Sequence, residues 1–352
     1  MIRKTIDIVI AVAKQGGVET VINIVAQYLE QQNYKVRLIQ MVYEGDEWYY
    51  NRSNFFYLLT DRKNNTDKLF IASYIDFILM HGAPDVMIAT GWPVLVWVCK
   101  NVCTQLNLST TVISWTHNVI DRYVANNFGG HEFLAMADIN LVLTSQMCQQ
   151  VIEHNPNAVV YNIGNPVEVK EDFSRDDMNN NSLVYVGRLD KNKQVDVIIK
   201  ALAQCTSTWN LVVIGDGREK ESLIELSKQF GVSDQVIWSG WKDNPREYLN
   251  DHYAFVIASE SEGFCVAAIE ASERGLPVIS TPVGIAPEYI TPGYNGYLFE
   301  KGNFIMLAQI LDFIAEGKLP RLSRTDCHNS ILKFEKKAYL ETIRKVIEHV
   351  TV

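Results

Sequence analysis

Short apolar runs and longer amphipathic segments alternate along most of the chain. Ile6–Val12, Lys35–Met41 and Thr111–Trp115 are typical of buried parallel strands. Gly17–Gln31 and Ser145–Glu153 carry their apolar residues at helical spacing. This alternation predicts an α/β fold assembled from strand–helix repeats.

The alternation is interrupted once. The residues Gly164-Asn165-Pro166 are typical of a turn. Residues 168–181 are polar, acidic and rich in asparagine, as in an interdomain linker or surface loop. The pattern restarts at Ser182–Val186 and continues to the apolar run Tyr253–Ala258. We therefore predict two Rossmann-like, doubly wound domains that face a cleft, residues 1–165 and residues 166–333. A final helix at about residues 334–352 is expected, which can pack back on the first domain.

Composition and charge exclude several classes of protein. The net charge of −9 argues against a nucleic-acid binder that depends on an overall positive field. Six scattered cysteines without a C-x-x-C pair predict reduced thiols in a cytoplasmic protein. The N-terminus lacks the pattern of a secretion signal, and no apolar run approaches the ~20 residues that span a bilayer. We expect a cytoplasmic protein, with peripheral contact at the inner face of the membrane left open.

The region from Tyr43 to Tyr74 has the least regular pattern. It groups several aromatic residues with four basic ones. Two interpretations remain open: aromatic side chains packed under a long loop, or a surface that binds an acceptor or a membrane.

The segment 261–270 carries the most informative chemistry. It follows the strand-like run Tyr253–Ala258, contains Gly263 at a turn, and leads into a helix. Free amides at a helix start attract phosphate, and open α/β sheets bind ligands at the carboxyl ends of their strands. Glu262 and Glu270 can hold hydroxyl groups on either side of such a phosphate. This arrangement suits a nucleotide sugar.

Four further features stand at predicted strand ends. Gly16-Gly17 is either a ligand-binding glycine loop or a plain tight turn. Arg188 and Lys193 can converge on a diphosphate, or can be solvated surface cations. Gly215, in a Gly-Asp-Gly turn, either reverses the chain or lines a nucleotide pocket. His117 is either structural, or hydrogen-bonds a sugar hydroxyl or steadies a departing phosphate.

Together these motifs resemble the retaining glycosyltransferases of family four, which have the GT-B fold. The resemblance covers most of the chain and is strongest from about Leu183 to Glu300. Its most specific mark is the E-x7-E arrangement of Glu262 and Glu270. Two positions depart from the family pattern, because Gln194 and Cys265 stand where glycine is frequent.

The resemblance implies roles for these residues. Arg188 and Lys193 would hold the donor diphosphate, Glu270 the ribose hydroxyls, and Glu262 the transferred sugar. His117 would contact the sugar from the other domain. The predicted catalytic residues are His117, Arg188, Lys193 and Glu262. The residues predicted to bind the donor are Gly16, Gly17, Gly215, Gly263, Phe264, Cys265, Val266 and Glu270.

The predicted activity is transfer of a hexose-type sugar, with retained configuration, from a UDP- or GDP-sugar to a glycan or lipid-linked acceptor in cell-envelope polysaccharide, lipopolysaccharide or glycolipid synthesis. The resemblance implies that no metal or other cofactor is needed, and no D-x-D motif stands at a strand end to hold a metal. Another GT-B enzyme acting on nucleotide sugars, of the epimerase or phosphorylase type, and a non-catalytic sugar-nucleotide-binding protein are the alternatives.

Overall fold

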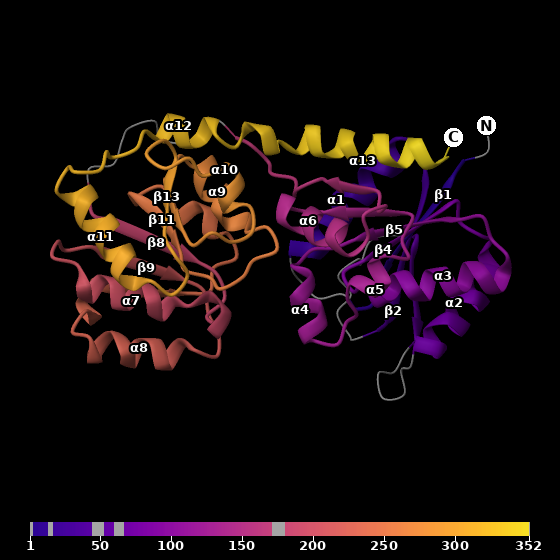
Figure 1. Cartoon of the computed structure of the whole chain (residues 1–352), viewed down its shortest axis with the longest axis horizontal. Coiled ribbons are helices and arrows are strands. Elements are labelled where there is room, and N and C mark those ends of the chain that lie inside the picture. Colours follow the sequence, from indigo (N-terminus) through magenta and orange to yellow (C-terminus); the bar gives the residue numbers. More distant parts are fainter. Residues whose placement is uncertain (1–2, 13–16, 44–52, 60–66, 171–179, 352) are drawn as a thin grey trace. The chain divides into compact units, whose positions relative to one another are not determined.

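The computed structural model describes residues 3–12, 17–43, 53–59, 67–170 and 180–351. The described chain divides into two compact units. The N-terminal unit comprises Met1–Pro166 together with Lys337–Val352, and the C-terminal unit comprises Val167–Lys336. Each unit is a parallel sheet with helices on both faces (Figure 1). The doubly wound α/β architecture is therefore confirmed for both halves of the chain.

The sheet of the N-terminal unit has the strand order β3-β2-β1-β4-β5-β6-β7, and all its pairings are parallel. Its strands are β1 (Thr5–Ile10), β2 (Lys35–Val42), β3 (Phe55–Leu59), β4 (Val86–Thr90), β5 (Thr111–Trp115), β6 (Ile139–Val142) and β7 (Val160–Asn162). Its helices are α1 (Gly17–Gln31), α2 (Asp67–His81), α3 (Val94–Leu106), α4 (Ile120–Ala125), α5 (His131–Leu134), α6 (Ser145–His154) and α13 (Lys336–Thr351).

The sheet of the C-terminal unit has the order β10-β9-β8-β11-β12-β13, again parallel throughout. Its strands are β8 (Ser182–Val186), β9 (Asn210–Ile214), β10 (Val236–Gly240), β11 (Ala254–Ile257), β12 (Val278–Ser280) and β13 (Gly296–Leu298). Its α-helices are α7 (Val195–Gln204), α8 (Lys220–Gln229), α9 (Val266–Glu273), α10 (Ala286–Tyr289), α11 (Phe304–Ala315) and α12 (Arg324–Asn329), and its 3-10 turns are η1 (Lys191–Lys193), η2 (Ser233–Gln235), η3 (Pro245–Tyr248) and η4 (Leu332–Phe334).

The last helix, α13, belongs to the N-terminal unit over most of its length. Its side chains at helical spacing, including Leu340, Ile343 and Ile347, are buried. Tyr28 Oη of α1 donates a hydrogen bond to Glu341 Oε2 at 3.4 Å. The chain thus returns to its first unit after it has completed the second.

The region from Tyr43 to Tyr74 contains more regular structure than its sequence suggests. Phe55–Leu59 forms the edge strand β3, which pairs with β2, and α2 begins at Asp67. Phe56 packs edge-on against Phe77, with ring centroids 4.9 Å apart. Residues 55–59 are thus not part of a long loop, because they form a strand that packs on α2, and the acceptor or membrane surface stays a prediction. Residues 44–52 and 60–66 lie outside the described residues.

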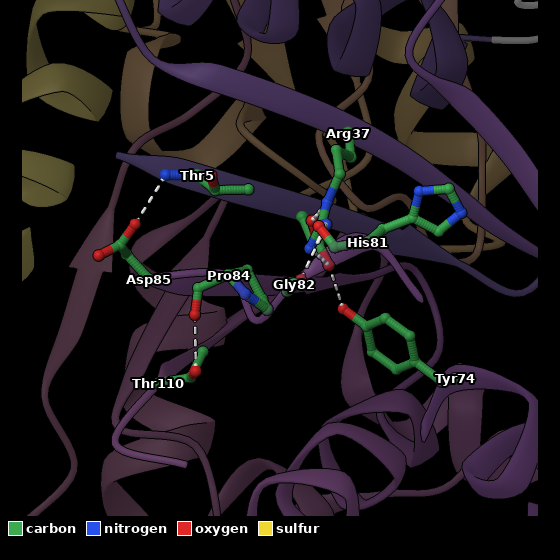
Figure 2. A network of polar contacts seen from close by, with 9 residues as sticks. Thr5, Arg37, Tyr74, His81, Gly82, Pro84, Asp85 and Thr110 are labelled. Carbon is green, nitrogen blue, oxygen red and sulfur yellow. Dashed lines mark hydrogen bonds and ion pairs between the residues drawn. The ribbon is translucent and has the colours of Figure 1, made fainter. Parts of the chain in front are cut away.

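In the N-terminal unit, a buried ion pair joins the strands β1 and β2 near their amino-terminal ends (Figure 2). Arg37 Nε and Nη2 donate to the two carboxylate oxygens of Asp7 at 2.5 and 2.8 Å. Arg37 Nη1 also donates to the backbone oxygens of His81 and Gly82 at the end of α2, and Tyr74 Oη donates to Asp7 at 2.7 Å. Burial raises the pKa of Asp7, whereas Arg37 and Tyr74 oppose that rise. These contacts join β1, β2 and α2.

Candidate functional site

In the C-terminal unit, the charged candidate residues follow the two strands at which the strand order reverses. From β8 the chain proceeds through β9 to β10 on one side, and β11 is added on the other side of β8. The loops after β8 and β11 therefore leave the sheet in opposite directions, and this is where open α/β sheets bind ligands. Arg188 and Lys193 lie in the loop after β8, and Glu262 lies in the loop after β11.

These two loops are bonded directly to each other. Asn192 Nδ2 donates to the backbone oxygen of Ser261 at 2.9 Å, and Ser261 Oγ donates to Asn192 Oδ1 at 2.9 Å. The backbone N–H of Glu260 donates to the backbone oxygen of Asn192 at 2.8 Å. The neighbouring residue Lys193 is thereby held opposite Glu262.

Lys193 and Glu262 form a largely buried ion pair. Lys193 Nζ donates to Glu262 Oε1 at 2.6 Å, and the two side chains are 19% and 12% exposed. Ser259 Oγ donates to the same oxygen at 2.7 Å. Within the described part of the chain, Oε2 receives no hydrogen bond, so Glu262 retains an acceptor for a ligand hydroxyl.

Arg188 is placed differently from Lys193. Its backbone oxygen accepts a hydrogen bond from Tyr185 Oη at 2.9 Å, which fixes the start of the loop. Its side chain is 67% exposed and lies 3.6 Å from Asp190 Oδ2. An exposed pair of this kind contributes little stability, and its guanidinium is accessible to an anion. The two predicted cations thus share one loop, but only Lys193 is held by a buried partner.

The turn that leads into α9 is tightly supported. Phe264 is buried and packs edge-on against Phe334, and its backbone oxygen accepts from the N–H of Ile285 at 2.9 Å. A Cβ on Gly284 would lie 2.5 Å from that same oxygen, so only glycine fits there. Gly263 and Cys265 flank Phe264, and Cys265 adopts a left-handed conformation with φ 73°. Burial raises the pKa of the Cys265 thiol to about 12, so this thiol stays protonated.

Helix α9 begins directly after this turn, at Val266. The first N–H groups of a helix have no acceptor within the helix and carry the positive end of its dipole. The start of α9 therefore provides donors for an anion beside the loop that holds Glu262.

Glu270 lies farther along α9 and is half-buried. Burial raises the pKa of its carboxyl group, and the nearby Arg246 acts in the opposite direction. No residue of the described ranges donates a hydrogen bond to this carboxylate or forms an ion pair with it. Its acceptors are consequently available to a ligand.

Gly215 has a structural reason to be glycine. It adopts φ 149°, and a Cβ there would lie 1.9 Å from the backbone oxygen of Gly187. Its N–H donates to the backbone oxygen of Gly240 at 2.9 Å. The close approach of the turns after β8 and β9 explains this residue, and a donor-binding role stays a prediction.

In the N-terminal unit, His117 follows β5. Its Nε2 lies 2.8 Å from Thr90 Oγ1, and its backbone N–H donates to Tyr123 Oη at 2.9 Å. Burial lowers the pKa of the imidazole to about 3, so it is neutral near pH 7. A neutral imidazole can hydrogen-bond a sugar hydroxyl, but it brings no positive charge to a departing phosphate.

The predicted glycine loop of the N-terminal unit is only partly described. Gly17 is the first residue of α1, and a Cβ on it would meet no atom within 4 Å. Packing therefore gives no reason for glycine at this position. Gly16 lies outside the described residues.

Sequence reasoning missed Arg246 and Glu273. Arg246, in η3, forms an ion pair with Glu273 at the end of α9, and only 1% of the Glu273 side chain is exposed. The pairing is not local, because the two residues are 27 positions apart. One signal was present: Glu270 and Glu273 are spaced to share a helix face.

The described part of the chain holds neither a metal-binding cluster nor a membrane-spanning helix. Among the residues described, no group of three or more His, Cys, Asp or Glu side chains could hold a metal ion. None of the helices there is both long and apolar enough to cross a bilayer.

Two doubly wound parallel sheets, the second with a lysine–carboxylate pair and a helix start where its strand order reverses, have the two-domain α/β fold of the GT-B type. Residues 167–330 match the family model described as "Glycosyl transferases group 1". The C-terminal unit thus matches this group of glycosyltransferases, as the sequence motifs predict.

Two known proteins with similar sequences are both named lipopolysaccharide 1,6-galactosyltransferase. The chain is 28% identical over 246 residues to the lipopolysaccharide 1,6-galactosyltransferase of Escherichia coli K12, and the aligned region covers 67% of each chain. It is 31% identical over 205 residues to the protein of the same name from Salmonella typhimurium LT2, which covers 54% of this chain and 55% of that relative. The match to the second relative thus spans little more than half of that protein's length.

A solved structure shares the fold over nearly the whole chain. The apo form of the lipopolysaccharide outer core galactosyltransferase WaaB superposes with a TM-score of 0.87 at 23% identity, covering 98% of this chain and 99% of that one. Anabaena Alr3699/HepE, solved in complex with UDP and glucose, gives a TM-score of 0.78 at 15% identity, with 99% and 100% covered.

Proposed function

We propose that this glycosyltransferase is a retaining, metal-independent enzyme that transfers a hexose-type sugar from a UDP- or GDP-sugar. The acceptor is a glycan or a lipid-linked glycan of cell-envelope synthesis, such as lipopolysaccharide. The observation that carries the proposal is the Lys193–Glu262 pair beside the start of α9. A cation, helix-start amides and a carboxylate with a spare acceptor match the diphosphate and the sugar hydroxyls of such a donor.

In this mechanism, the bond between the anomeric carbon and the diphosphate oxygen breaks, and the diphosphate keeps the electron pair. An acceptor hydroxyl oxygen bonds the anomeric carbon on the same face and gives its proton to the departing diphosphate. Negative charge grows on the leaving group, where Lys193, Arg188 and the first amides of α9 stabilise it. Lys193 is neutralised by Glu262 when no donor is bound, so the diphosphate competes with that carboxylate for the ammonium. Glu262 Oε2 accepts from a hydroxyl of the transferred sugar, and Glu270 accepts from the ribose.

The names of two relatives support an envelope glycan as the acceptor, since both are lipopolysaccharide 1,6-galactosyltransferases. The fold shared with HepE, a protein solved in complex with UDP and glucose, favours a uridine nucleotide. We propose that the N-terminal unit binds the acceptor and that His117 hydrogen-bonds the transferred sugar as a neutral imidazole. Peripheral contact with the inner face of the membrane is part of this proposal.

Thermal unfolding with a panel of UDP-, GDP- and ADP-sugars tests the donor class, because a ligand that binds only the folded protein raises Tm. We expect a UDP- or GDP-hexose to raise Tm and to be hydrolysed slowly without an acceptor. A protein that binds the nucleotide sugar but never cleaves it would be a binding protein instead. Failure of every nucleotide sugar to raise Tm would contradict the proposal.

A further inference from the structure

A buried carboxylate lies at the end of α9, behind the proposed donor site. Glu273 is the last residue of α9, and its Oε1 accepts from the backbone N–H of Lys170 at 2.8 Å. The same oxygen is ion-paired with Arg246 Nη2. Arg246 comes from η3, after β10, and its side chain is 18% exposed. An arginine from a distant loop is thereby anchored against α9.

Arg246 also acts on Glu270. Glu270 and Glu273 are three residues apart, so their side chains are neighbours on one face of α9. Arg246 lowers the pKa of Glu270, against the effects of burial and of the like charge on Glu273. Arg246 Nε is buried and has no hydrogen-bond partner among the described residues. A guanidinium with an unused donor thus lies within electrostatic reach of a carboxylate that has unused acceptors.

One other described cation pairs with α9: Arg274, directly after the helix, places its Nε 3.8 Å from Glu273 Oε2. The strands β11 and β12, which pack on α9, contain no charged residue. From α12, Arg324 Nη2 donates to the backbone oxygen of Arg274, and His328 Nδ1 lies 2.6 Å from the backbone oxygen of Glu273. At the start of α9, the Cys265 thiol is protonated. Among the described residues, Arg246 is the cation that lowers the pKa of Glu270.

We propose that Arg246 is a positioning residue of the donor site: anchored by Glu273, it keeps the Glu270 carboxylate an anion that accepts hydrogen bonds from the ribose hydroxyls. The inference rests on the proposed function, because the role of Glu270 on the ribose is part of it. A half-buried carboxylate without a nearby cation would lose its charge more readily, and it would discriminate weakly between ligands with and without a ribose hydroxyl.

The test compares UDP with 2′-deoxy-UDP, which lacks one ribose hydroxyl, by calorimetry at pH 7. The quantity measured is the ratio of the two dissociation constants. A hydrogen bond to a charged group contributes enough for a ratio of roughly 10 or more in the wild type. Glu270→Ala should bring the ratio close to one. We expect Arg246→Met to lower it at least about threefold, and Arg246→Lys, which keeps the positive charge, to restore most of it.

Arg321→Met is the matched control. Arg321 is a partly buried arginine of the same unit that donates to the backbone oxygen of Asn180 at 2.8 Å and lies over the ring of Tyr253. Arg321→Met removes contacts of a similar kind, but these contacts do not involve Glu270. The ratio of the two dissociation constants should therefore not change. Thermal unfolding of each variant checks folding, and Arg246→Gln replaces Arg246→Met if the latter does not fold.

A pH series adds a readout that a merely structural role would not change. Without Arg246 the pKa of Glu270 rises, and protonation removes the negative charge and turns one acceptor oxygen into a donor. The affinity of Arg246→Met for UDP should therefore fall more steeply than that of the wild type between pH 8 and pH 6. Equal slopes would overturn the positioning role.

The outcomes separate this inference from the proposed function. An unchanged ratio in Arg246→Met, with the ratio lost in Glu270→Ala, overturns the inference and leaves the donor site standing. An equal loss in Arg321→Met also overturns it. If Glu270→Ala leaves the ratio unchanged, or if neither UDP nor GDP binds the wild type, the proposed donor site fails.

Discussion

The two units are built on the same plan but place their charged residues at opposite ends of the strands. In the N-terminal unit, the buried pair of Asp7 and Arg37 lies at the amino-terminal ends of the strands. The polar contact of His117 and Thr90 at the carboxyl ends is uncharged near pH 7. In the C-terminal unit, the pair of Lys193 and Glu262 lies at the carboxyl ends.

The two ion pairs also differ in how completely they are satisfied. Both carboxylate oxygens of Asp7 are engaged, by Arg37 and Tyr74, and the carboxylate is fully buried. Glu262 receives both of its hydrogen bonds on one oxygen and is 12% exposed. A saturated buried pair specifies the fold, whereas a pair with spare acceptors at the carboxyl edge of a sheet is suited to bind a ligand.

The largest effect is expected from the saturated pair. Arg37→Met leaves Asp7 buried without its cation, which should lower the free energy of unfolding by about 3–5 kcal/mol. Urea unfolding measures this loss. Arg344→Met is the control, because Arg344 pairs with Glu341 and Glu348 on the surface of α13, and its loss should lower the free energy of unfolding far less. Equal losses in both variants would contradict a structural role specific to the buried pair.

The pair of Lys193 and Glu262, which keeps a spare acceptor, should affect the rate of sugar transfer rather than the stability of the fold. Replacing both Arg188 and Lys193 with alanine should lower turnover by roughly two orders of magnitude or more, as does the loss of oxyanion donors. Donor hydrolysis or sugar transfer under saturating donor measures the effect. Lys191→Ala, in the same loop but exposed, should keep nearly full activity. Turnover near the wild-type rate in the double variant would remove the electrostatic role.

The neutral histidine predicts a pH effect on stability. The pKa of His117 is lowered from 6.5 to about 3 on folding, so below pH 6.5 the unfolded chain binds a proton that the folded chain does not. The free energy of unfolding then falls as the pH falls. Between pH 6.5 and 5.5 the wild type should lose on the order of 1 kcal/mol more than His117→Gln. Parallel pH profiles of the two proteins would show that His117 titrates normally.

The smallest effect concerns backbone strain beside Lys193. Gln194 adopts φ 47° and ψ 43°, a left-handed conformation that costs most residues about 1–2 kcal/mol. Gln194→Gly should raise the free energy of unfolding by up to about 1 kcal/mol, after the entropy gained by the unfolded chain is subtracted. Lys191→Gly, in η1, has no such strain to relieve and should not stabilise the protein. Destabilisation by Gln194→Gly would indicate that the hydrogen bond from its side chain to Glu260 matters more.

Much of the fold could be predicted from the sequence, because buried strands are apolar and flanked by turn residues. The strands Thr111–Trp115 and Ser182–Val186 have the predicted bounds. Strand β3 was missed, since its aromatic residues show neither clean alternation nor clear turn signals. Helix α2, which follows it, is apolar around most of its circumference, so it lacks the usual helical signature.

The candidate site was predictable in its residue types but not in its pairings. The strand-end positions of Arg188, Lys193 and Glu262 follow from local pattern. The bond between Lys193 and Glu262 depends on strand order, which joins residues 69 positions apart. The left-handed conformations of Gln194 and Cys265 explain why glycine suits both positions, and the side chains alone did not reveal this. Arg246 was missed for the same reason as the ion pair, since its partner lies on another element.

The most direct measurement is a crystal structure of the chain with UDP. The account predicts that the diphosphate lies within hydrogen-bond distance of Lys193 Nζ and the first amides of α9, with Glu270 accepting from the ribose. UDP bound at another site of the C-terminal unit, or bound with Lys193 still paired only to Glu262, would contradict it.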